Sequence, residues 1–465
     1  MMALLHEPGT LYIIAEWIVR LAMLVVVPFR RSAEATRSWL LLIFFLPIPG
    51  LLLYLAIGRP RFPAWRMERF AALRPFFAEL SSRFATAPSA GAVPALVARL
   101  GGMPATQGNA IEWLGDYDVV IERLVADIDG ARHHVRLLAY IFADDAAGRR
   151  VIEALARATG RGVSCHVLID PVGSHHWVRR TVRLLRAASV ETRETLPLNL
   201  LRGRTRRDMR NHRKLFLIDG TIGYAGSQNL VRKDFRPGIV NQELVLRVTG
   251  PAVAQMSAVF IADWYLETET LLEAKPTIPP PAGGASVQVL PSGPDYPGEG
   301  FRTLLVWQVH AARERVTIVT PYLIPDEGLL GALGTAVLRG VTVDLIVSAV
   351  IDQPLVGLAQ RSYYDELLRL GIRVHRYRDY LLHAKNVSID GRLAIVGSSN
   401  VDIRSFQLND EVSVLLEDAD AVAALETIQS AYKAGSDRLD LSTWRRRPRA
   451  GRLAENAARL VSPLL

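Results

Sequence analysis

Residues 135–170 read VRLLAYIFADDAAGRRVIEALARATGRGVSCHVLID, and residues 316–352 read VTIVTPYLIPDEGLLGALGTAVLRGVTVDLIVSAVID. Each stretch begins with an apolar run, passes through an acidic turn into a helical pattern, and reaches a second apolar run after Arg-Gly-Val. This order is typical of a strand–helix–strand unit, and the continuously apolar runs predict a sheet that is covered on both faces. Tyr140 and Tyr322 precede the acidic turns at matching positions. The repeat therefore predicts an α/β fold with two similar domains.

A polar motif follows each of these units. Residues 211–229 read NHRKLFLIDGTIGYAGSQN, and residues 382–400 read LHAKNVSIDGRLAIVGSSN. Both copies contain a histidine, a lysine two residues later, an aspartate five residues after that, and a closing Gly-Ser-x-Asn box, all at identical spacing. The chemical groups are contributed by His212, Lys214, Asp219, Ser227 and Asn229 in the first copy and by His383, Lys385, Asp390, Ser398 and Asn400 in the second.

Strand geometry explains the spacing of the motif. Alternate residues of a strand project to the same side, so each histidine is expected to point the same way as the lysine that follows it. Asp219 and Asp390 each precede a glycine, as in a hairpin turn, and the returning strand brings the serine and asparagine back beside the histidine. Two imidazoles, two ammonium groups, two amides and two hydroxyls suit a phosphodiester. We therefore expect the two copies to form the halves of one active site.

Two apolar stretches lie near the N-terminus, at residues 11–28 and 39–57. At about 1.5 Å per residue, each is long enough to cross, or nearly cross, a hydrocarbon core of about 30 Å. Glu16 and Arg20 interrupt the first stretch at a spacing that allows them to pair on one helix face. We expect residues 1–60 to form a two-helix membrane anchor.

The anchor has one open alternative and an orientation to assign. A cleaved signal peptide is the alternative, although residues 1–10 contain no lysine or arginine and a second apolar stretch follows. The sequence Pro-Ile-Pro-Gly at residues 47–50 predicts a kink or a re-entrant turn in the second stretch. Four arginines follow that stretch and three lie between the two, which favours a multi-pass protein of the inner membrane with a cytoplasmic body.

Composition divides the rest of the chain. Residues 61–110 form a juxtamembrane region, and the Pro/Gly-rich residues 275–285 are typical of a linker. We expect the first α/β domain at residues 111–274 and the second at residues 286–465.

The charge of the chain favours an anionic partner. It has 55 lysines and arginines against 46 acidic residues, a net charge of +9. The single cysteine, Cys165, excludes an internal disulfide and a multi-cysteine metal site, and its apolar neighbours predict a buried strand. Basic clusters comprise Arg202, Arg204, Arg206, Arg207, Arg210, Arg213 and Lys214 before the first motif, and Arg445, Arg446, Arg447, Arg449 and Arg452 near the C-terminus.

The duplicated motif resembles that of the phospholipase D superfamily, and the likeness is closer to one branch, the bacterial cardiolipin synthases. The resemblance extends to LPIPGLLLYLAIGRP, YIFADD, VLIDPVGS, VLPSGPDY, TPYLIPD and DIRSFQLNDE, so that it covers nearly the whole chain. It implies two similar α/β domains with the active site at their interface, and neither a metal nor another cofactor. It also implies anionic phospholipids as partners in preference to nucleic acid.

The same resemblance implies roles for the motif residues. His212 is the expected nucleophile and His383 the expected acid and base, although the symmetry of the motif leaves the reverse assignment open. Glu243 and Glu411 open apolar strands after each box and are the expected orienting carboxylates. The lysines and asparagines are expected to stabilise the phosphoryl oxygens, with the serines as further hydrogen-bond donors. Asp219 and Asp390 are expected to form turns and are also counted among the catalytic residues.

The implied activity is phosphatidyl transfer between two phosphatidylglycerol molecules through a covalent phosphatidyl-histidine, which gives cardiolipin and glycerol. The alternatives are a membrane-bound hydrolase of the phospholipase D type, a nuclease, and a scaffold with an inactive site. The apolar stretches disfavour the nuclease, and the complete pairs of histidine, lysine and asparagine disfavour the scaffold.

Overall fold

The first half of the body combines parallel and antiparallel strands in a computed structural model, which describes residues 8–58, 62–84, 91–197 and 208–462. Strands β2 and β3 run parallel with helix α8 between them, as the repeat predicts. From the outer edge inward the strand order is β4-β3-β2-β5-β6-β8-β1. The elements are β1 (Thr106–Leu114), α7 (Tyr117–Asp129), β2 (His134–Ala139), α8 (Ala146–Gly160), β3 (Ser164–Ile169), α9 (Val178–Ala187), β4 (Glu191–Glu194), β5 (Leu215–Ile218), β6 (Ile222–Gly226), β7 (Asn241–Gln242), β8 (Val245–Thr249) and α10 (Ala252–Thr268).

The second half repeats this arrangement and adds one strand at its edge. Its order is β17-β12-β11-β10-β14-β15-β16-β9, in which β10, β11 and β12 run parallel. The predicted α/β class and its duplication are therefore confirmed. The elements are β9 (Ala285–Ser292), α11 (Gly300–Ala311), β10 (Arg315–Val319), α12 (Glu327–Leu338), β11 (Thr342–Ser348), α13 (Pro354–Arg369), β12 (Arg373–Tyr377), β13 (Leu381–Leu382), β14 (Asn386–Ile389), β15 (Leu393–Gly397), β16 (Glu411–Leu416), α14 (Ala419–Ala434), β17 (Ser436–Arg438), α15 (Leu441–Arg445) and α16 (Arg449–Val461), with a 3₁₀ turn at Pro297–Glu299 and a π-helical turn at Arg404–Leu408.

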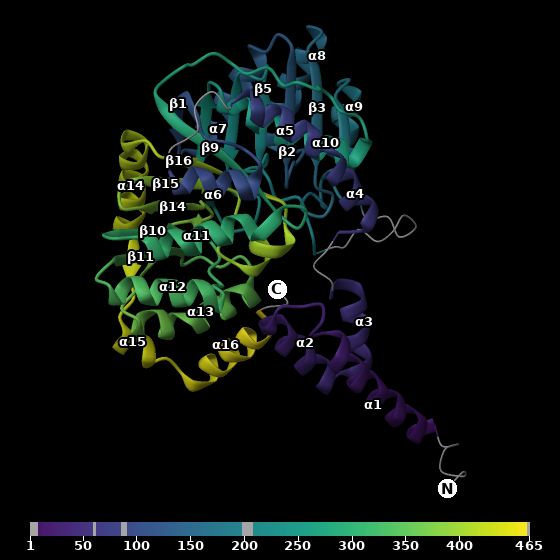
Figure 1. The fold of residues 1–465 in the computed structure, drawn as a ribbon, viewed down its shortest axis with the longest axis vertical. Helices are drawn as coiled ribbons and strands as arrows, with labels where there is room; N and C mark the ends of the chain where they lie inside the picture. Colours follow the sequence, from purple (N-terminus) through teal and green to yellow (C-terminus); the bar gives the residue numbers. More distant parts are fainter. Residues whose placement is uncertain (1–7, 59–61, 85–90, 198–207, 463–465) are drawn as a thin grey trace.

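The two halves share one sheet of 15 strands, because β1 pairs antiparallel with β9. The side chain of Asn109 strengthens this junction by donating to the carbonyl of Ala285 at 3.2 Å. A second, two-stranded sheet also links the halves, since β7 pairs with β13. The first half lies above the second in Figure 1.

Helices cover both faces of the sheet, as its continuously apolar strands predict. Helices α7, α8 and α9 pack on one face of the first half, and α11, α12 and α13 pack on the second. Helices α10 and α14 cover the other face near the junction, where side chains of both halves form one core. Cys165 is buried in β3, and burial raises the pKa of its thiol to about 12, in agreement with the packing role expected of it.

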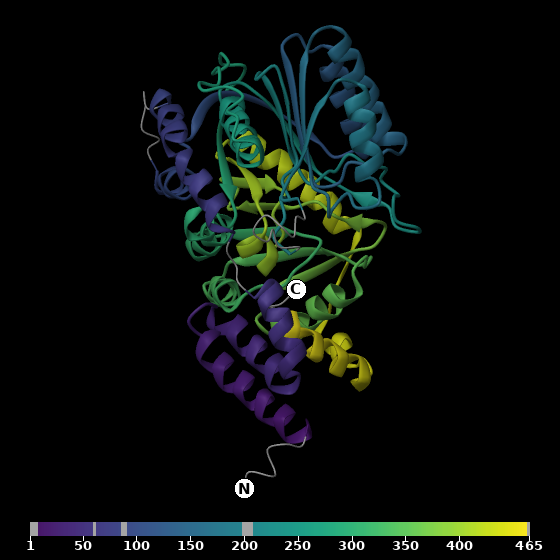
Figure 2. The ribbon, with the colours of Figure 1, turned by 90° about the vertical axis from the view of Figure 1, so that its right-hand side faces the viewer.

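The N-terminal helices project from the lower end of the body in Figures 1 and 2. Helix α1 (Pro8–Val26) packs against α2 (Ala33–Phe45) and α3 (Pro47–Ile57) through a small core that includes Trp39 and Tyr54. Glu16 and Arg20 form the expected ion pair at 3.2 Å. Apolar side chains on the outer faces of these helices, Ile18 and Phe45 among them, are exposed.

The second apolar stretch has the break that its Pro-Ile-Pro-Gly sequence predicts, and it forms two short helices in place of one long helix. Among the described residues, α1 alone is long and apolar enough to cross a membrane. The second stretch is divided because Pro47 has no N–H to continue α2, so α2 ends at Phe45 and α3 starts afresh. Gly50 then lies directly against Ile43, where a side chain would crowd the backbone.

Three short helices, α4 (Ala64–Ala72), α5 (Arg74–Arg83) and α6 (Ala92–Gly101), connect the N-terminal helices to the body. Helix α4 packs against α10, and α6 packs against β9. Strand β1 begins at Thr106, a few residues before the boundary expected at residue 111. Residues 275–284 contain neither helix nor strand, and β9 begins at Ala285.

Candidate active site

The two motif histidines lie at equivalent positions on either side of one cavity. His212 precedes β5, and His383 precedes β14, so each comes from the start of the central hairpin of its half. Both histidines line a cavity of about 270 Å³ together with Asn229 and Asn400. The structure therefore brings the two copies of the motif to a single cavity between the halves.

Each histidine is hydrogen-bonded to a carboxylate from the opposite half. His383 Nδ1 lies 2.8 Å from Glu243 Oε1, and His212 Nδ1 lies 3.0 Å from Glu411 Oε1. An imidazole that donates from Nδ1 to a carboxylate keeps Nε2 available to accept a proton or to attack. The two orienting pairs thus cross the interface.

Backbone hydrogen bonds tie each histidine to the other half as well. The amide of His212 donates to the carbonyl of Asp410 at 2.8 Å, and the amide of His383 donates to the carbonyl of Gln242 at 2.8 Å. Asp410 and Gln242 are the residues immediately before the two glutamates. Each histidine therefore has its backbone and its ring bound by two consecutive residues of the opposite half, Asp410 and Glu411 for His212, and Gln242 and Glu243 for His383.

The glutamates are themselves held by buried hydroxyl groups. Ser398 donates to Glu411, and Ser405 donates to the same carboxylate at 2.8 Å. In the other pair, burial tends to raise the pKa of Glu243, but His383 and a hydrogen bond from Ser227 lower it overall. Both serines are fully buried, Ser398 at the Glu411 carboxylate and Ser227 at the backbone of Leu244, to whose carbonyl it donates at 3.2 Å. The role of Ser227 and Ser398 as donors to the substrate stays a prediction.

The motif lysines lie beneath the histidines. Lys214 Nζ donates to the carbonyl of His212 at 2.6 Å, and Lys385 Nζ donates to the carbonyl of His383 at 2.6 Å. Burial lowers the pKa of Lys214 to about 7 and that of Lys385 to about 8, although Glu411 and Glu243 act in the opposite direction. The ring of Tyr140 lies 5.2 Å from the Lys214 ammonium.

The electrostatic setting favours neutral imidazoles. Burial, with help from Lys214 and Lys385, outweighs the opposing effect of Glu411 and lowers the pKa of His212 to about 4. Burial and the same two lysines likewise lower the pKa of His383 to about 4. At neutral pH each ring is therefore unprotonated, which is the state that can attack phosphorus or accept a proton.

The two asparagines line the cavity walls. Asn229 accepts a hydrogen bond from the amide of Ile141 at 3.0 Å through its Oδ1, which fixes the orientation of its side chain. The backbone amide of Asn400 donates to Ser405 Oγ at 3.0 Å. The side chain of Asn229 can therefore present its NH2 group to an anionic substrate, and the same role for Asn400 stays a prediction.

Comparisons with known proteins place this arrangement in a family. A family profile described as "Cardiolipin synthase, PLD-like domain" matches residues 124–264 and 305–431, which together make up more than half of the chain. The chain belongs to this family. A second profile, described as "Phospholipase_D-nuclease N-terminal", matches residues 18–59.

Relatives of the family match over almost the full length. Cardiolipin synthase A of Pectobacterium carotovorum subsp. carotovorum is 35% identical over 461 residues, which cover 94% of each protein. Cardiolipin synthase A of Salmonella paratyphi B is 34% identical, with 98% of this chain and all of that protein covered. The chain is accordingly a phosphatidyltransferase of phospholipid biosynthesis.

A solved structure supports the fold independently of sequence. Phosphatidylserine synthase from Haemophilus influenzae superposes with a TM-score of 0.63 at 17% identity. The match covers 81% of this chain and the whole of that one. At this level of identity the likeness concerns the fold alone.

The turn aspartates of this family member lie away from the cavity, which corrects their inclusion in the catalytic set. The carboxylate of Asp219 accepts hydrogen bonds from the amides of residues 132–134 at 2.7 to 2.9 Å. Asp390 binds the amides of residues 313–315 in the same way at 2.9 Å. Each histidine precedes its strand, β5 or β14, and each aspartate follows the other end of the same strand. Both carboxylates therefore stabilise turns.

The basic run before the first motif is not an exposed surface where the structure describes it. Arg202, Arg204, Arg206 and Arg207 lie outside the described residues, whereas Arg210, Arg213 and Lys214 are buried. Arg210 pairs with Asp170 at 2.8 Å. In the C-terminal cluster, Arg445 pairs with Asp365 and Arg447 with Glu455, while Arg446, Arg449 and Arg452 are exposed.

Several cavity residues were not predicted as site residues. Tyr140 packs edge-on against the His212 ring with 4.8 Å between ring centroids. Tyr322 donates to Asp352 at 2.7 Å, and Arg236 pairs with the same carboxylate. The matching positions of the two tyrosines were a usable signal, but nothing in the sequence pointed to Arg236. Within the part of the chain that the structure describes, no group of three or more His, Cys, Asp or Glu side chains is arranged to hold a metal ion.

Proposed function

We propose that this phosphatidyltransferase joins two phosphatidylglycerol molecules into cardiolipin with release of glycerol. The observation that carries the proposal is the pair of imidazoles in one cavity, each oriented by a glutamate from the opposite half. Transfer by two successive displacements requires one nucleophile and one group that gives and then takes a proton. Two histidines at equivalent positions supply both.

In the first displacement, Nε2 of His212 attacks the phosphorus of the donor lipid and forms a P–N bond. The bond from phosphorus to the oxygen of the headgroup glycerol breaks, and His383 gives its proton to that oxygen. In the second displacement, His383 removes the proton from a hydroxyl of the second lipid, whose oxygen attacks phosphorus and breaks the P–N bond. The assignment of His212 as nucleophile rests on the family resemblance.

The surroundings suit the charge that these steps involve. An anionic phosphodiester beside the imidazoles offsets the lysines, so substrate binding raises the pKa of His383 and allows it to act as an acid. Lys214 and Lys385 supply positive charge beneath the histidines, and Asn229 and Asn400 supply amide donors at the cavity.

We further propose that the protein is a multi-pass inner-membrane enzyme with a cytoplasmic body. Helix α1 has the length to cross the bilayer, and α2 and α3 together form a second apolar segment that would cross it with a kink at Pro47. Exposed apolar side chains on these helices would then face lipid. Residues 111–274 and 286–465 are taken as its two domains, consistent with the repeated strand order.

An assay with phosphatidylglycerol as the sole lipid tests the activity. Cardiolipin and glycerol in equal amounts are the expected products, and His212→Ala is expected to abolish turnover. Phosphatidic acid without cardiolipin would identify a hydrolase instead. Turnover that persists in His212→Ala would contradict the proposed chemistry.

A further inference from the structure

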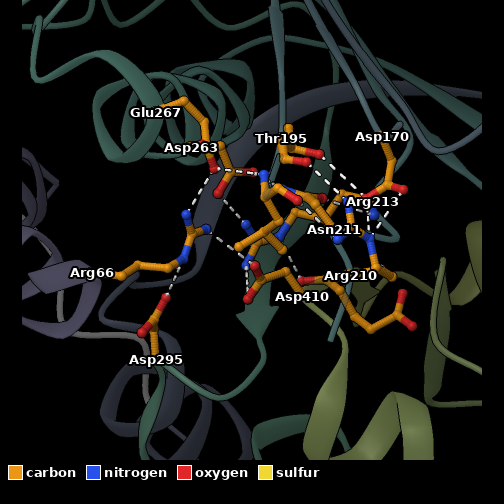
Figure 3. Close-up of polar contacts among 12 residues, drawn as sticks. Arg66, Asp170, Thr195, Arg210, Asn211, Arg213, Asp263, Glu267, Asp295 and Asp410 are labelled. Carbon is orange, nitrogen blue, oxygen red and sulfur yellow. Dashed lines mark hydrogen bonds and ion pairs between the residues drawn. The ribbon is translucent and has the colours of Figure 1, made fainter. Parts of the chain in front are cut away.

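A buried cluster of charged side chains includes Arg213 and Asp410, the neighbours in sequence of His212 and Glu411, and one of its members, Arg66, comes from the N-terminal segment (Figure 3). Arg66 belongs to α4, the first helix after the apolar N-terminal helices, and its side chain is completely buried. Its neighbours come from α10, from the segment after β9, and from the two segments that carry the first histidine and its glutamate. The cluster consists of Arg66, Arg213, Asp263, Glu267, Asp295 and Asp410.

Arg66 contacts three carboxylates at once. Its Nη1 donates to Glu267 at 2.7 Å, its Nε lies 3.5 Å from Asp295, and its Nη2 donates to Asp410 at 3.5 Å. Its guanidinium also stacks over the ring of Phe62 at 4.8 Å. A planar guanidinium can serve several acceptors in fixed directions, which an ammonium cannot.

Asp410 connects Arg66 to the reacting groups. The carbonyl of Asp410 accepts from the amide of His212 at 2.8 Å, and the next residue, Glu411, binds the ring of His212. Arg213, which follows His212, lies 3.8 Å from the Asp410 carboxylate and donates to the carbonyl of Glu411 at 2.9 Å. The position of Asp410 therefore affects both groups that hold the histidine.

Apolar packing reinforces the same connection. Phe62 is buried together with Met209 and Leu408, which lie three residues before His212 and Glu411 respectively. The segment leading into α4 thus touches both of the chain segments that form the His212–Glu411 pair.

The charge balance makes Arg66 hard to replace. Four carboxylates face two guanidinium groups in this cluster. Burial raises the pKa of Asp295 and of Asp410, and Arg66 and Arg213 oppose that rise. Without Arg66, the carboxylate of Asp410 would lose a principal partner in a buried setting.

The other histidine has no equivalent support in the described structure. Gln242 occupies the position that corresponds to Asp410, and its side chain donates to the carbonyl of Gly115 at 2.7 Å. His383 is therefore positioned by a neutral residue, and only the His212 side connects to the charged cluster.

We propose that Arg66 is a positioning residue for the transfer reaction, which fixes Asp410 and thereby holds His212 and Glu411 in reactive geometry. The inference builds on the proposed function, because it assigns a support to the same site. It makes the helix that follows the membrane segment a part of the catalytic unit.

The test compares Arg66→Gln with Arg69→Gln in the full-length protein in detergent micelles. Arg69 is a matched control, because it lies on the same helix, stacks on Trp65 at 4.8 Å and bonds to the Leu266 carbonyl at 2.9 Å, yet touches no member of the cluster in the described structure. We expect Arg66→Gln to lower kcat by about tenfold or more with KM within about twofold, as displacement of a reacting group does. Arg69→Gln is expected to keep kcat within about twofold of wild type.

Two controls keep the result interpretable. Thermal unfolding of both variants shows whether either has lost its fold. If Arg66→Gln does not fold, Arg66→Lys takes its place. We expect Arg66→Lys to have the melting temperature of the wild type and a smaller loss of kcat. Unchanged kcat in the folded variant, or a rise in KM alone, would overturn the proposal. Turnover is measured as phosphatidylglycerol consumed, so the ratio between variants remains a valid test even if the product is phosphatidic acid and the proposed function fails.

Discussion

Glu243 in the first half of the chain lies 2.8 Å from the Nδ1 atom of His383 in the second half. The reciprocal pair, Glu411 with His212, crosses in the opposite direction. Neither half therefore contains a histidine together with the carboxylate that orients it, and the site exists only where the halves meet.

Replacing either glutamate by glutamine should disable the site without disrupting the fold. The amide keeps the shape of the side chain but cannot stabilise an imidazolium, and it favours the wrong tautomer of the ring. We expect Glu243→Gln and Glu411→Gln each to lower kcat by about a hundredfold or more. Steady-state assays with purified protein measure the effect, and a variant within about twofold of wild type would show that the pair is not needed.

The turn aspartates should behave in the opposite way. Asp219→Ala leaves three backbone amides without their acceptor, and Asp219 also has a positive φ of 52° that alanine adopts less readily than aspartate. We expect a loss of about 1–3 kcal/mol in the free energy of unfolding, with kcat of the folded protein retained. Denaturant titration gives the first quantity. A large fall in kcat at unchanged stability would restore Asp219 to the catalytic set.

The pH dependence should be limited on the alkaline side by the lysines. Burial lowers the pKa of Lys214 to about 7, so its positive charge is present below that pH and is lost as pH rises through it. The pKa of His212, about 4, keeps the imidazole neutral down to acidic pH. We expect kcat/KM to decline as pH rises through 7, because Lys214 loses its charge there and because His383, which must carry a proton to act as the acid, is protonated in an ever smaller fraction of the protein.

A lysine-to-arginine substitution provides the matching control. Arginine stays protonated across this range. Lys214→Arg should therefore remove the decline in kcat/KM near pH 7 that is due to Lys214, and it should keep the decline that is due to Lys385, whose pKa is about 8. An alkaline limb that is identical in the variant and the wild type would exclude Lys214 as its origin.

Removing residues 1–60 should separate membrane attachment from chemistry. The ion pair between Arg37 of α2 and Glu327 is exposed on both sides, so its loss is expected to cost the body little. We expect activity on phosphatidylglycerol bilayers to fall while activity on detergent micelles is largely kept. Equal activity of the truncated and full-length proteins on both substrates would argue against an anchoring role.

Local spacing was enough to predict the duplicated fold. The strand rule predicted that His212 and Lys214 point the same way, but both lie just before β5, where Lys214 donates to the carbonyl of His212. The crossing of Glu243 to His383 was not predictable in this way, because it depends on how the halves face one another. The buried role of Ser398 follows from the same arrangement.

Other features were missed because burial depends on distant partners. Arg213 reads as part of a basic surface until Asp263 and Asp410 surround it. Arg66 looks like one of several arginines beside a membrane segment, and only the folded chain places it among carboxylates. The break at Pro47, by contrast, was a local signal, and its effect was to divide the second apolar stretch into two short helices.

The pairing of β1 with β9 has a mechanical consequence. The main sheet is hydrogen-bonded across the junction, and the β7–β13 pair adds a second connection. These hydrogen bonds oppose a hinge motion that would separate the two halves. Both displacements of the proposed reaction would therefore take place at the same fixed pair of histidines, where the first alcohol has to leave before the second arrives.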